Sequence, residues 1–191
     1  MVHILTNEYR VVNPWFGRAR SVLEMDMGCG KGALTLALAR RFPDRLILGT
    51  DIMLGRLRKV QKALAREGLP NVELLRADNA QLAGFLLPDG CIARLHILCP
   101  DPWPKARHRA KRLITSEFVG RVHRILAPGG ILHVSTDHQP YLATLRRIID
   151  RSELFLEAPE TIADVVDIET GFEAQWRSRG RPVPHLGYRR A

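Results

Sequence analysis

Short apolar runs alternate along this chain with stretches in which apolar residues recur at helical spacing. Seven runs have the length of strands and lie at residues 22–27, 46–50, 72–77, 92–99, 131–136, 154–156 and 183–188. Helices are predicted between and after them, at residues 33–41, 54–66, 80–87, 113–126, 140–150 and 170–179. This alternation with short connections is typical of an α/β fold, in which a mostly parallel sheet of seven strands carries helices on both faces.

Each of the first five predicted strands has an aspartate at or just beyond its carboxyl end. These residues are Asp26, Asp51, Asp78, Asp101 and Asp137. One such aspartate would be explained as a helix N-cap or a turn residue, and Asp78 taken alone fits a cap equally well. Ligands of open α/β sheets bind outside the carboxyl ends of the strands. Five acids at one edge therefore predict a binding site there.

A glycine-rich loop, Gly28-Cys29-Gly30-Lys31-Gly32, joins the first predicted strand to the first helix. Glycines at this position let the backbone turn tightly and approach a ligand closely. Asp51 lies about 20 residues further on, where an acid would bind a ribose hydroxyl of either a dinucleotide or S-adenosylmethionine. Asp26, on the strand before the glycines, suits an ammonium better than a pyrophosphate. With Asp78 placed to accept from an adenine amino group, the pattern favours S-adenosylmethionine.

The segment after the fourth strand turns at Asp101, between two prolines, and then becomes strongly basic. Five cations surround His108 within eight residues: Lys105, Arg107, Arg109, Lys111 and Arg112. The whole chain carries 29 Lys and Arg against 20 Asp and Glu, a formal charge of +9. Clustered cations beside a binding edge favour a nucleic-acid partner over a solvated charged turn. Trp103 either stacks on an unpaired base or packs as a buried indole.

Other residues limit the function classes. The three cysteines, Cys29, Cys91 and Cys99, form no C-x-x-C pair, which fits a reducing compartment and gives no zinc signature. No apolar run approaches the ~20 residues of a membrane span, and the beginning of the chain does not read as a secretory signal. We therefore expect a cytoplasmic protein without a membrane segment.

The histidines of the predicted strands are expected to be packed side chains. His96 and His133 both lie in core strands. A metal site built from His133, Asp137 and His138 is the less favoured interpretation, because zinc ligands usually show tighter, paired spacing.

The string Pro100-Asp101-Pro102-Trp103-Pro104-Lys105, with Arg107-His108, resembles the bacterial tRNA (guanine-N7-)-methyltransferases. The resemblance extends from about Trp15 to the C-terminus. It implies a Rossmann-like class I methyltransferase fold, S-adenosylmethionine as cofactor, and methyl transfer to N7 of a guanine in the tRNA variable loop. The sequence departs from the family pattern in having Asp26 where Glu is usual and Ala110 where charge is usual.

The resemblance also implies roles for individual residues. Asp101 matches the active-site acid, and the cofactor contacts correspond to Asp26, Asp51, Asp78 and Asp101, with Gly28, Gly30 and Gly32 of the loop. Substrate-binding positions correspond to Lys105, Asp137, Thr170, Gly171, Phe172 and Glu173. The RNA-contacting stretch corresponds to Arg107, His108, Arg109, Lys111 and Arg112, and a second cluster of arginines, at 177, 179, 181, 189 and 190, is predicted to extend that surface.

We expect residues 1–191 to form one catalytic domain, with residues 1–20 as a lead-in that includes a turn at 13–17, and to act as a monomer or a homodimer. Three other functions stay open on the sequence alone. They are methyl transfer to another acceptor, RNA binding without catalysis, and nucleotide-dependent oxidoreduction.

Overall fold

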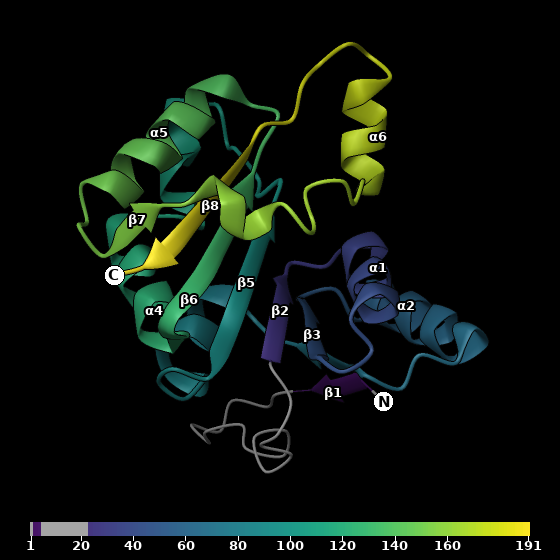
Figure 1. Cartoon of the computed structure of the whole chain (residues 1–191). Coiled ribbons are helices and arrows are strands. Elements are labelled where there is room, and N and C mark those ends of the chain that lie inside the picture. The colour runs from purple at the N-terminus through teal and green to yellow at the C-terminus, as the bar shows by residue number, and fades with distance from the viewer. Residues whose placement is uncertain (1, 5–22) are drawn as a thin grey trace.

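The computed structural model describes residues 2–4 and 23–191, and the turn predicted at residues 13–17 lies outside this part. Eight strands form one sheet in the order β1-β4-β3-β2-β5-β6-β8-β7 (Figure 1). The strands are β1 (Val2–Ile4), β2 (Leu23–Met27), β3 (Leu46–Asp51), β4 (Val72–Arg76), β5 (Ile92–Leu98), β6 (Leu126–Ser135), β7 (Phe155–Glu157) and β8 (His185–Arg190).

The order in which the chain adds strands to the sheet changes side at β2. From β2 the chain adds β3 and β4 on one side, and β5 and β6 on the other, and all of these pairs are parallel. β8 is antiparallel to both of its neighbours, β6 and β7. The predicted mostly parallel α/β sheet is therefore confirmed, and its switch point lies between β2 and β5, where ligands of such sheets bind.

The predicted number of seven strands was wrong, because the sheet has eight. The structure adds β1, which pairs with β4 so that Val2 lies opposite Leu74. Three residues are too few to show an alternating pattern, so the pairing depends on contacts with a distant strand. The strand predicted at residues 131–136 also differs, because β6 begins earlier, at Leu126, and its pairing with β5 shifts register between Ile92 and Arg94.

The helices lie close to their predicted positions. They are α1 (Ala33–Arg41), α2 (Leu54–Glu67), α3 (Asn79–Gln81), α4 (Ser116–Ile125), α5 (Gln139–Asp150) and α6 (Gly171–Arg177). The predicted helix at 80–87 divides into α3 and a π-helical turn, η2 (Leu82–Leu86), and two 3₁₀ helices are added, η3 (Ala106–Lys111) and η4 (Pro159–Ile162). The helix predicted from 113 begins at Ser116, because the Thr115 hydroxyl accepts from the Phe118 amide at 3.2 Å and caps it.

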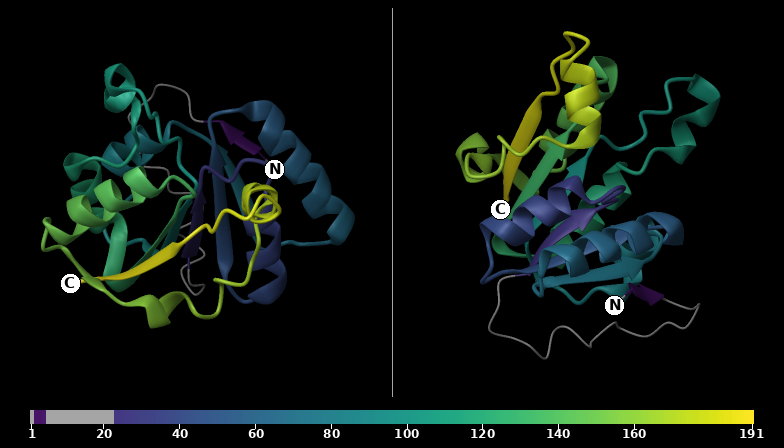
Figure 2. Two further views of the ribbon diagram at one scale, coloured as in Figure 1. Left: turned by 90° about the horizontal axis from the view of Figure 1, so that it is seen from above. Right: turned by 90° about the vertical axis from the view of Figure 1, so that its right-hand side faces the viewer.

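Helices cover both faces of the sheet (Figures 1 and 2). On one face the apolar side chains of α4 and α5, such as Val122 and Leu145, share a core with Met25 and Leu95. On the other, α1 and α2 bury a second core, to which η4 adds Ile162. Burying each large aliphatic side chain stabilises the fold by roughly 1.5–3 kcal/mol. The two cores hold the parallel strands in register, and this fixes the edge at which their carboxyl ends meet.

No helix within residues 2–4 and 23–191 is both long and apolar enough to cross a membrane.

Candidate functional site

The glycine loop is a tight turn at the switch point. Gly28, Gly30 and Gly32 have φ angles of 85°, 56° and 81°, which strain any residue with a side chain. The amides of Gly28 and Cys29 both donate to the carbonyl of Thr50, at 2.9 and 2.7 Å. A Cβ on Gly32 would lie 2.7 Å from the Val60 side chain of α2. The loop is therefore held against β3 and α2 at the beginning of α1.

Two of the predicted acids contact this loop or the helix that follows it. Asp26 is only 4% exposed, and its carboxylate accepts from the Thr35 hydroxyl at 2.6 Å. Burial raises the pKa of Asp26, and the Thr35 hydrogen bond opposes that rise. The carboxylate of Asp51 accepts from the Gly30 amide at 3.1 Å and from the Met53 amide at 2.7 Å. The predicted grouping of Asp26 and Asp51 with the glycines is present.

The third acid has the capping role that the sequence allowed. Asp78 is exposed, and its Oδ1 accepts from the Gln81 amide at 2.9 Å at the beginning of α3. The adjoining Asn79 was not predicted, yet it accepts from the Thr50 hydroxyl at 2.9 Å and lies close to Gly28. Asn79 therefore joins the end of β4 to the glycine loop. The sequence did contain a signal for Asn79, because this polar residue directly follows Asp78, the acid at the end of a predicted strand.

Two apolar side chains beside Asp51 were also missed. Ile52 and Met53 are 59% and 52% exposed, although they follow a fully buried strand. Large apolar side chains that stay exposed next to a polar site often mark a binding surface. An apolar pair immediately after the strand-end acid could have indicated them.

Asp101 and Asp137 follow the ends of two neighbouring strands. Leu98 of β5 lies opposite Ser135 of β6. Asp101 follows three residues after Leu98, and Asp137 follows two residues after Ser135, so both acids come shortly after the same level of the sheet. Asp101 is exposed and Asp137 is half-buried. Between β5 and Asp101 the backbone of Cys99 has a φ of 49°, and burial raises the pKa of its thiol to about 11. Cys99 was predicted inside the strand, but it lies one residue beyond it.

The basic segment forms an arm, residues 100–112, that stands away from the sheet (Figure 2). Lys105, Arg107, Arg109 and Lys111 are exposed on it, and His108 is half-buried. Trp103 has its ring centroid 5.6 Å from that of His108 and 4.9 Å from the Lys111 ammonium. The indole is half-buried by residues of its own arm, so packing is the interpretation that these contacts favour.

Arg112 has a different environment from the other cations of the arm. Its guanidinium donates to the carbonyls of Pro102 and Trp103, at 2.8 and 3.3 Å, and lies 4.9 Å from the ring centre of Tyr141. These contacts fix the base of the arm. Arg112 is thus a structural residue of the site, whereas its neighbours present their charge to solvent.

The predicted segment Thr170–Glu173 begins α6, which stands at the carboxyl edge of the parallel strands in Figure 1. The Glu173 amide donates to the Thr170 hydroxyl at 3.3 Å, and the Thr170 amide donates to the Glu173 carboxylate at 2.6 Å. This reciprocal pair is a capping box. Glu173 is 1% exposed, whereas Phe172 is 61% exposed. Of the four predicted residues, Gly171 and Phe172 are thus exposed, Thr170 is half-buried and Glu173 is buried.

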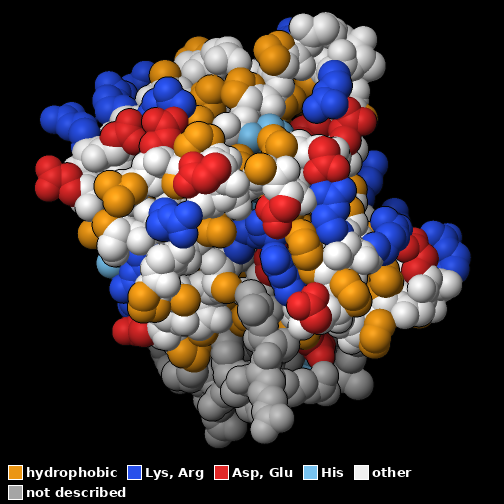
Figure 3. Space-filling model, in the orientation of Figure 1, with side chains coloured by type: hydrophobic (Ala, Val, Ile, Leu, Met, Phe, Trp, Pro, Cys, Tyr) orange, Lys and Arg blue, Asp and Glu red, His pale blue; other side chains and the backbone are white. Residues whose placement is uncertain are grey.

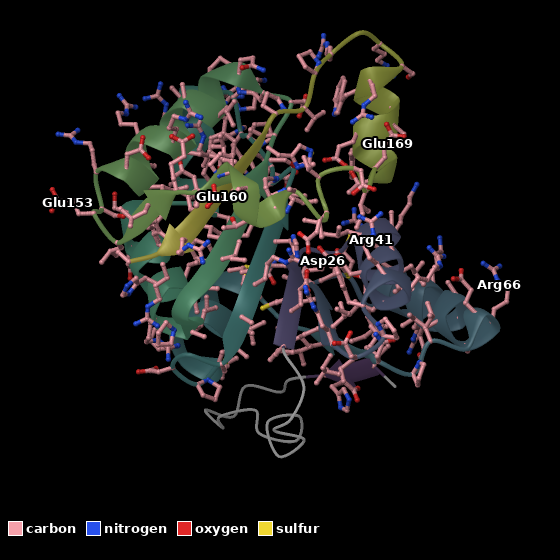
Figure 4. All side chains as sticks on the ribbon, viewed as in Figure 1. Asp26, Arg41, Arg66, Glu153, Glu160 and Glu169 are labelled. Carbon is pink, nitrogen blue, oxygen red and sulfur yellow. The ribbon has the colours of Figure 1, made fainter. Side chains whose placement is uncertain are left out.

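A paired arginine joins α1 to the segment before α6. Arg41 donates to both carboxylate oxygens of Asp167, at 2.5 and 2.7 Å, and lies close to the base of α6 in Figure 4.

The second predicted arginine cluster divides into two groups. Arg179 and Arg181 lie 5.2 and 5.0 Å from the ring of Trp176, next to α6. Arg189 lies on β8 opposite Ile131, towards the amino end of β6, and Arg190 donates to the Leu126 carbonyl. The prediction of one continuous surface was wrong, because β8 runs antiparallel and carries its last residues away from the binding edge. Figure 3 shows further Lys and Arg side chains over α2.

Solved structures with this architecture include several methyltransferases. The 16S rRNA methyltransferase KamB is 21% identical and has a TM-score of 0.68, and the match covers 94% of each of the two chains. A SAM-dependent methyltransferase from Aquifex aeolicus is 13% identical with a TM-score of 0.59, over 88% of this chain and 81% of that one. The fold is that of the Rossmann-like methyltransferases, as predicted.

Sequence comparison defines the family within that class. Residues 20–186 match the family model Methyltransf_4, described as "Putative methyltransferase". The tRNA (guanine-N(7)-)-methyltransferase of Methylococcus capsulatus (strain Bath) is 31% identical over 180 residues, 92% of this chain and 78% of that protein. The one from Corynebacterium efficiens is 33% identical over 147 residues, 77% of this chain. The chain belongs to the family of the bacterial tRNA (guanine-N(7)-)-methyltransferases, and it spans 58% of the length of the Corynebacterium efficiens relative.

Proposed function

We propose that this protein transfers a methyl group from S-adenosylmethionine to N7 of a guanine in the variable loop of tRNA. The observation that carries the proposal is the sequence of features along β5. This strand pairs with β2, the strand that leads into the glycine loop, ends near Asp101, and continues directly into the arm of exposed cations. One strand therefore links a cofactor edge to a surface for a polyanion. The relatives are named tRNA (guanine-N(7)-)-methyltransferases, which supports methyl transfer to guanine N7 of tRNA.

The residues at the edge fit S-adenosylmethionine. Asp26 is a buried carboxylate whose charge is opposed by its surroundings, and a bound ammonium would complement it. Asp51 is placed to bind ribose hydroxyls, because each carboxylate oxygen can accept more than one hydrogen bond. Ile52 and Met53 offer exposed apolar surface for a flat ring. When bound, this cofactor supplies an electrophilic methyl group on a sulfonium.

The chain's own acids would then orient the guanine. Guanine N7 has a lone pair and carries no proton, so no general base is needed, and the protein's task is alignment and stabilisation of developing charge. Asp101 and Asp137 leave neighbouring strands from a common point. Either carboxylate can accept from the N1–H and amino group of guanine, which would exclude adenine. A negative charge there also favours the positively charged product.

The arm would hold the RNA by its phosphates. Lys105, Arg107, Arg109 and Lys111 are exposed and follow Asp101 within ten residues. Phosphate contacts give position and affinity, whereas base contacts give selectivity. We also infer that the protein works in the cytoplasm as one catalytic domain, and its three free cysteines fit such a reducing compartment.

The test is methyl transfer from labelled S-adenosylmethionine to unmodified tRNA transcripts, followed by borohydride–aniline cleavage at N7-methylguanine. We expect one cut at a variable-loop guanine, and no label in a transcript whose variable-loop guanine is replaced by adenine. Cofactor binding without label in tRNA would contradict the proposal and move the function to another acceptor or to RNA binding alone.

A further inference from the structure

Five buried side chains form a continuous line across the sheet, which we call the histidine relay: Glu24, His96, His133, His185 and Glu173. Glu24 contacts Nε2 of His96 at 2.8 Å, and Nδ1 of His96 contacts Nδ1 of His133 at 2.8 Å. Nε2 of His133 contacts Nδ1 of His185 at 2.8 Å, and Nε2 of His185 contacts the Glu173 carboxylate at 3.1 Å. The relay thus runs from β2 through β5, β6 and β8 to α6.

The relay is closed to solvent. Glu24, His96 and His133 are 0% exposed, Glu173 is 1% exposed, and the His185 side chain is 8% exposed. Buried polar groups need hydrogen-bond partners, since an unsatisfied one costs about 1–3 kcal/mol. Each of the four contacts must therefore contain one hydrogen, between a donor on one side and a lone pair on the other.

Counting hydrogens determines the charge of the relay. Four contacts need four hydrogens, and three neutral imidazoles supply one N–H each. Ionised glutamates supply none, and both are ionised: contacts with histidine and arginine lower the pKa of Glu24 to about 2 against its burial, and His185 and Thr170 lower that of Glu173 against its burial. The fourth hydrogen is an additional proton, so one of the three rings is an imidazolium.

The groups around the two ends decide where that proton lies. Near His96 the charged groups are Glu24, Asp26, Arg94 and Arg45, with Asp164 on Arg94. Near His185 and Glu173 the charged group is Asp137, beside the uncharged Cys99, Ser135 and Thr170. At the His96 end two arginines offset two of the three carboxylates Glu24, Asp26 and Asp164 and repel a cation on His96. At the other end Glu173 has no cation beside it among the described residues except His185.

The middle ring is unsuited to carry the charge. Burial, together with His96, His185 and Arg94, lowers the pKa of His133 well below its usual value. With the proton on His185, that ring donates to His133 and to Glu173. His133 then donates from Nδ1 to His96, and His96 donates from Nε2 to Glu24, so that every contact is satisfied.

We propose that the relay carries one proton more than three neutral histidines, that this proton resides on His185, and that the resulting ion pair with Glu173 holds α6 on the sheet. Glu173 is also the third residue of α6 and forms its capping box with Thr170, so the relay fixes the first turn of the helix on which Phe172 is exposed. His185 is thus a positioning residue. The part that concerns substrate depends on the proposed function, and the charge of the relay does not.

The first experiment is nitrogen-15 NMR of the full chain labelled at histidine, at neutral pH. We expect both ring nitrogens of His185 to be protonated, and His96 and His133 each to carry one ring proton. Signals are assigned by single substitutions, with His123→Gln, outside the relay, as the control that leaves the three spectra unchanged. Three neutral rings, or an imidazolium at His96 or His133, would overturn the proposal.

Glu173→Gln is the matched variant, because an amide supplies the missing hydrogen without a charge. The introduced amide would donate to His185, His185 to His133, and His133 to His96, so all four contacts survive with three neutral rings. We expect this variant to fold and to show a neutral His185. An imidazolium at His185 in this variant would show that Glu173 does not determine its charge, and would contradict the proposal.

The second experiment measures amide hydrogen exchange in α6 as the pH is raised, corrected for the intrinsic exchange rate. In the wild type, loss of the additional proton leaves one contact without a hydrogen, and we expect exchange of α6 amides to rise at least about tenfold over that of α4. In Glu173→Gln the ratio should stay constant with pH. An equal response of the two proteins would refute the positioning role.

The same pH series with tRNA separates the two proposals. If both hold, the KM for tRNA rises with α6 exchange in the wild type while the affinity for S-adenosylhomocysteine stays unchanged. If the protein does not methylate tRNA, NMR and hydrogen exchange still test the relay. If tRNA is methylated but KM does not follow α6, the relay does not position the substrate.

Discussion

The glycine-loop edge and the basic arm meet beside β5, but they are built in opposite ways. At the edge, Asp26 and Asp51 are buried and hydrogen-bonded before any ligand binds. On the arm, the charges of Lys105, Arg107 and Arg109 are exposed to solvent. The first arrangement suits a small ligand that needs an exact geometry, and the second suits a large polyanion recognised through its charge. Substitutions in the two regions should therefore have different kinds of effect.

The largest effect is expected where the two regions meet. Asp101→Ala should lower the rate of methyl transfer by about 10²–10³-fold, because a group that stabilises developing charge is lost. Affinity for tRNA should stay close to that of the wild type, since the cations of the arm are retained. Single-turnover methylation and filter binding measure the two quantities. Asp44→Ala, an exposed acid just before β3, is the matched control and should retain full activity. If Asp101→Ala turned over at the wild-type rate, Asp101 would have no role in methyl transfer.

The buried region should also make stability depend on pH, whereas the exposed arm should not. Contacts with histidine and arginine outweigh burial and lower the pKa of Glu24 to about 2, so its stabilisation is complete above its usual pKa and is lost as the pH falls from about 4.5 towards 2. The expected loss is on the order of 3 kcal/mol. Burial also lowers the pKa of His133. The folded protein therefore begins to lose stability below pH 6.5, where the unfolded chain takes up a proton that the folded chain excludes.

Urea denaturation at pH 7, 5 and 3 measures this dependence. Glu24→Gln should flatten the part of the curve below pH 5, and Lys105→Ala should leave it unchanged. A Glu24→Gln curve parallel to that of the wild type would show that other carboxylates cause the acid sensitivity.

A medium effect is expected at the cofactor edge. Asp26→Asn retains a side chain that can bond to Thr35 but removes the charge that would meet an ammonium. We expect affinity for S-adenosylhomocysteine to fall about tenfold to hundredfold, the range for a hydrogen bond to a charged group. Isothermal titration measures this affinity. The folded protein should be at least as stable as the wild type, because burying a neutral amide costs less than burying a charge. Undiminished affinity would place the ammonium elsewhere.

The sequence predicted the features that depend on neighbouring residues. Short apolar runs located the strands from β2 to β8, and acids at the ends of the parallel strands located the edge to which Asp26 and Asp51 contribute. Features that depend on pairing between distant strands were missed. The contact between His96 and His133 requires their strands to be neighbours in one register. Both were predicted as packed histidines, and both are buried, but their separation of 37 positions gives no local signal. The role of Asn79 and the contacts that hold Arg112 were missed for the same reason, since their partners lie elsewhere in the sequence.

The smallest effects are expected on the arm, and they distinguish its two kinds of cation. Lys105→Ala should weaken tRNA binding only a fewfold and reduce the slope of log affinity against log salt by about one, because one phosphate contact is lost. Arg112→Ala removes bonds to the carbonyls of Pro102 and Trp103 instead. It should lower the protection of the arm from proteolysis and leave the stability of the sheet unchanged. Arg58→Ala, an exposed cation of α2, is the matched control for charge. An equal change of slope for Arg58→Ala and Lys105→Ala would mean that the RNA senses the net charge of the protein, and that the arm is no special site.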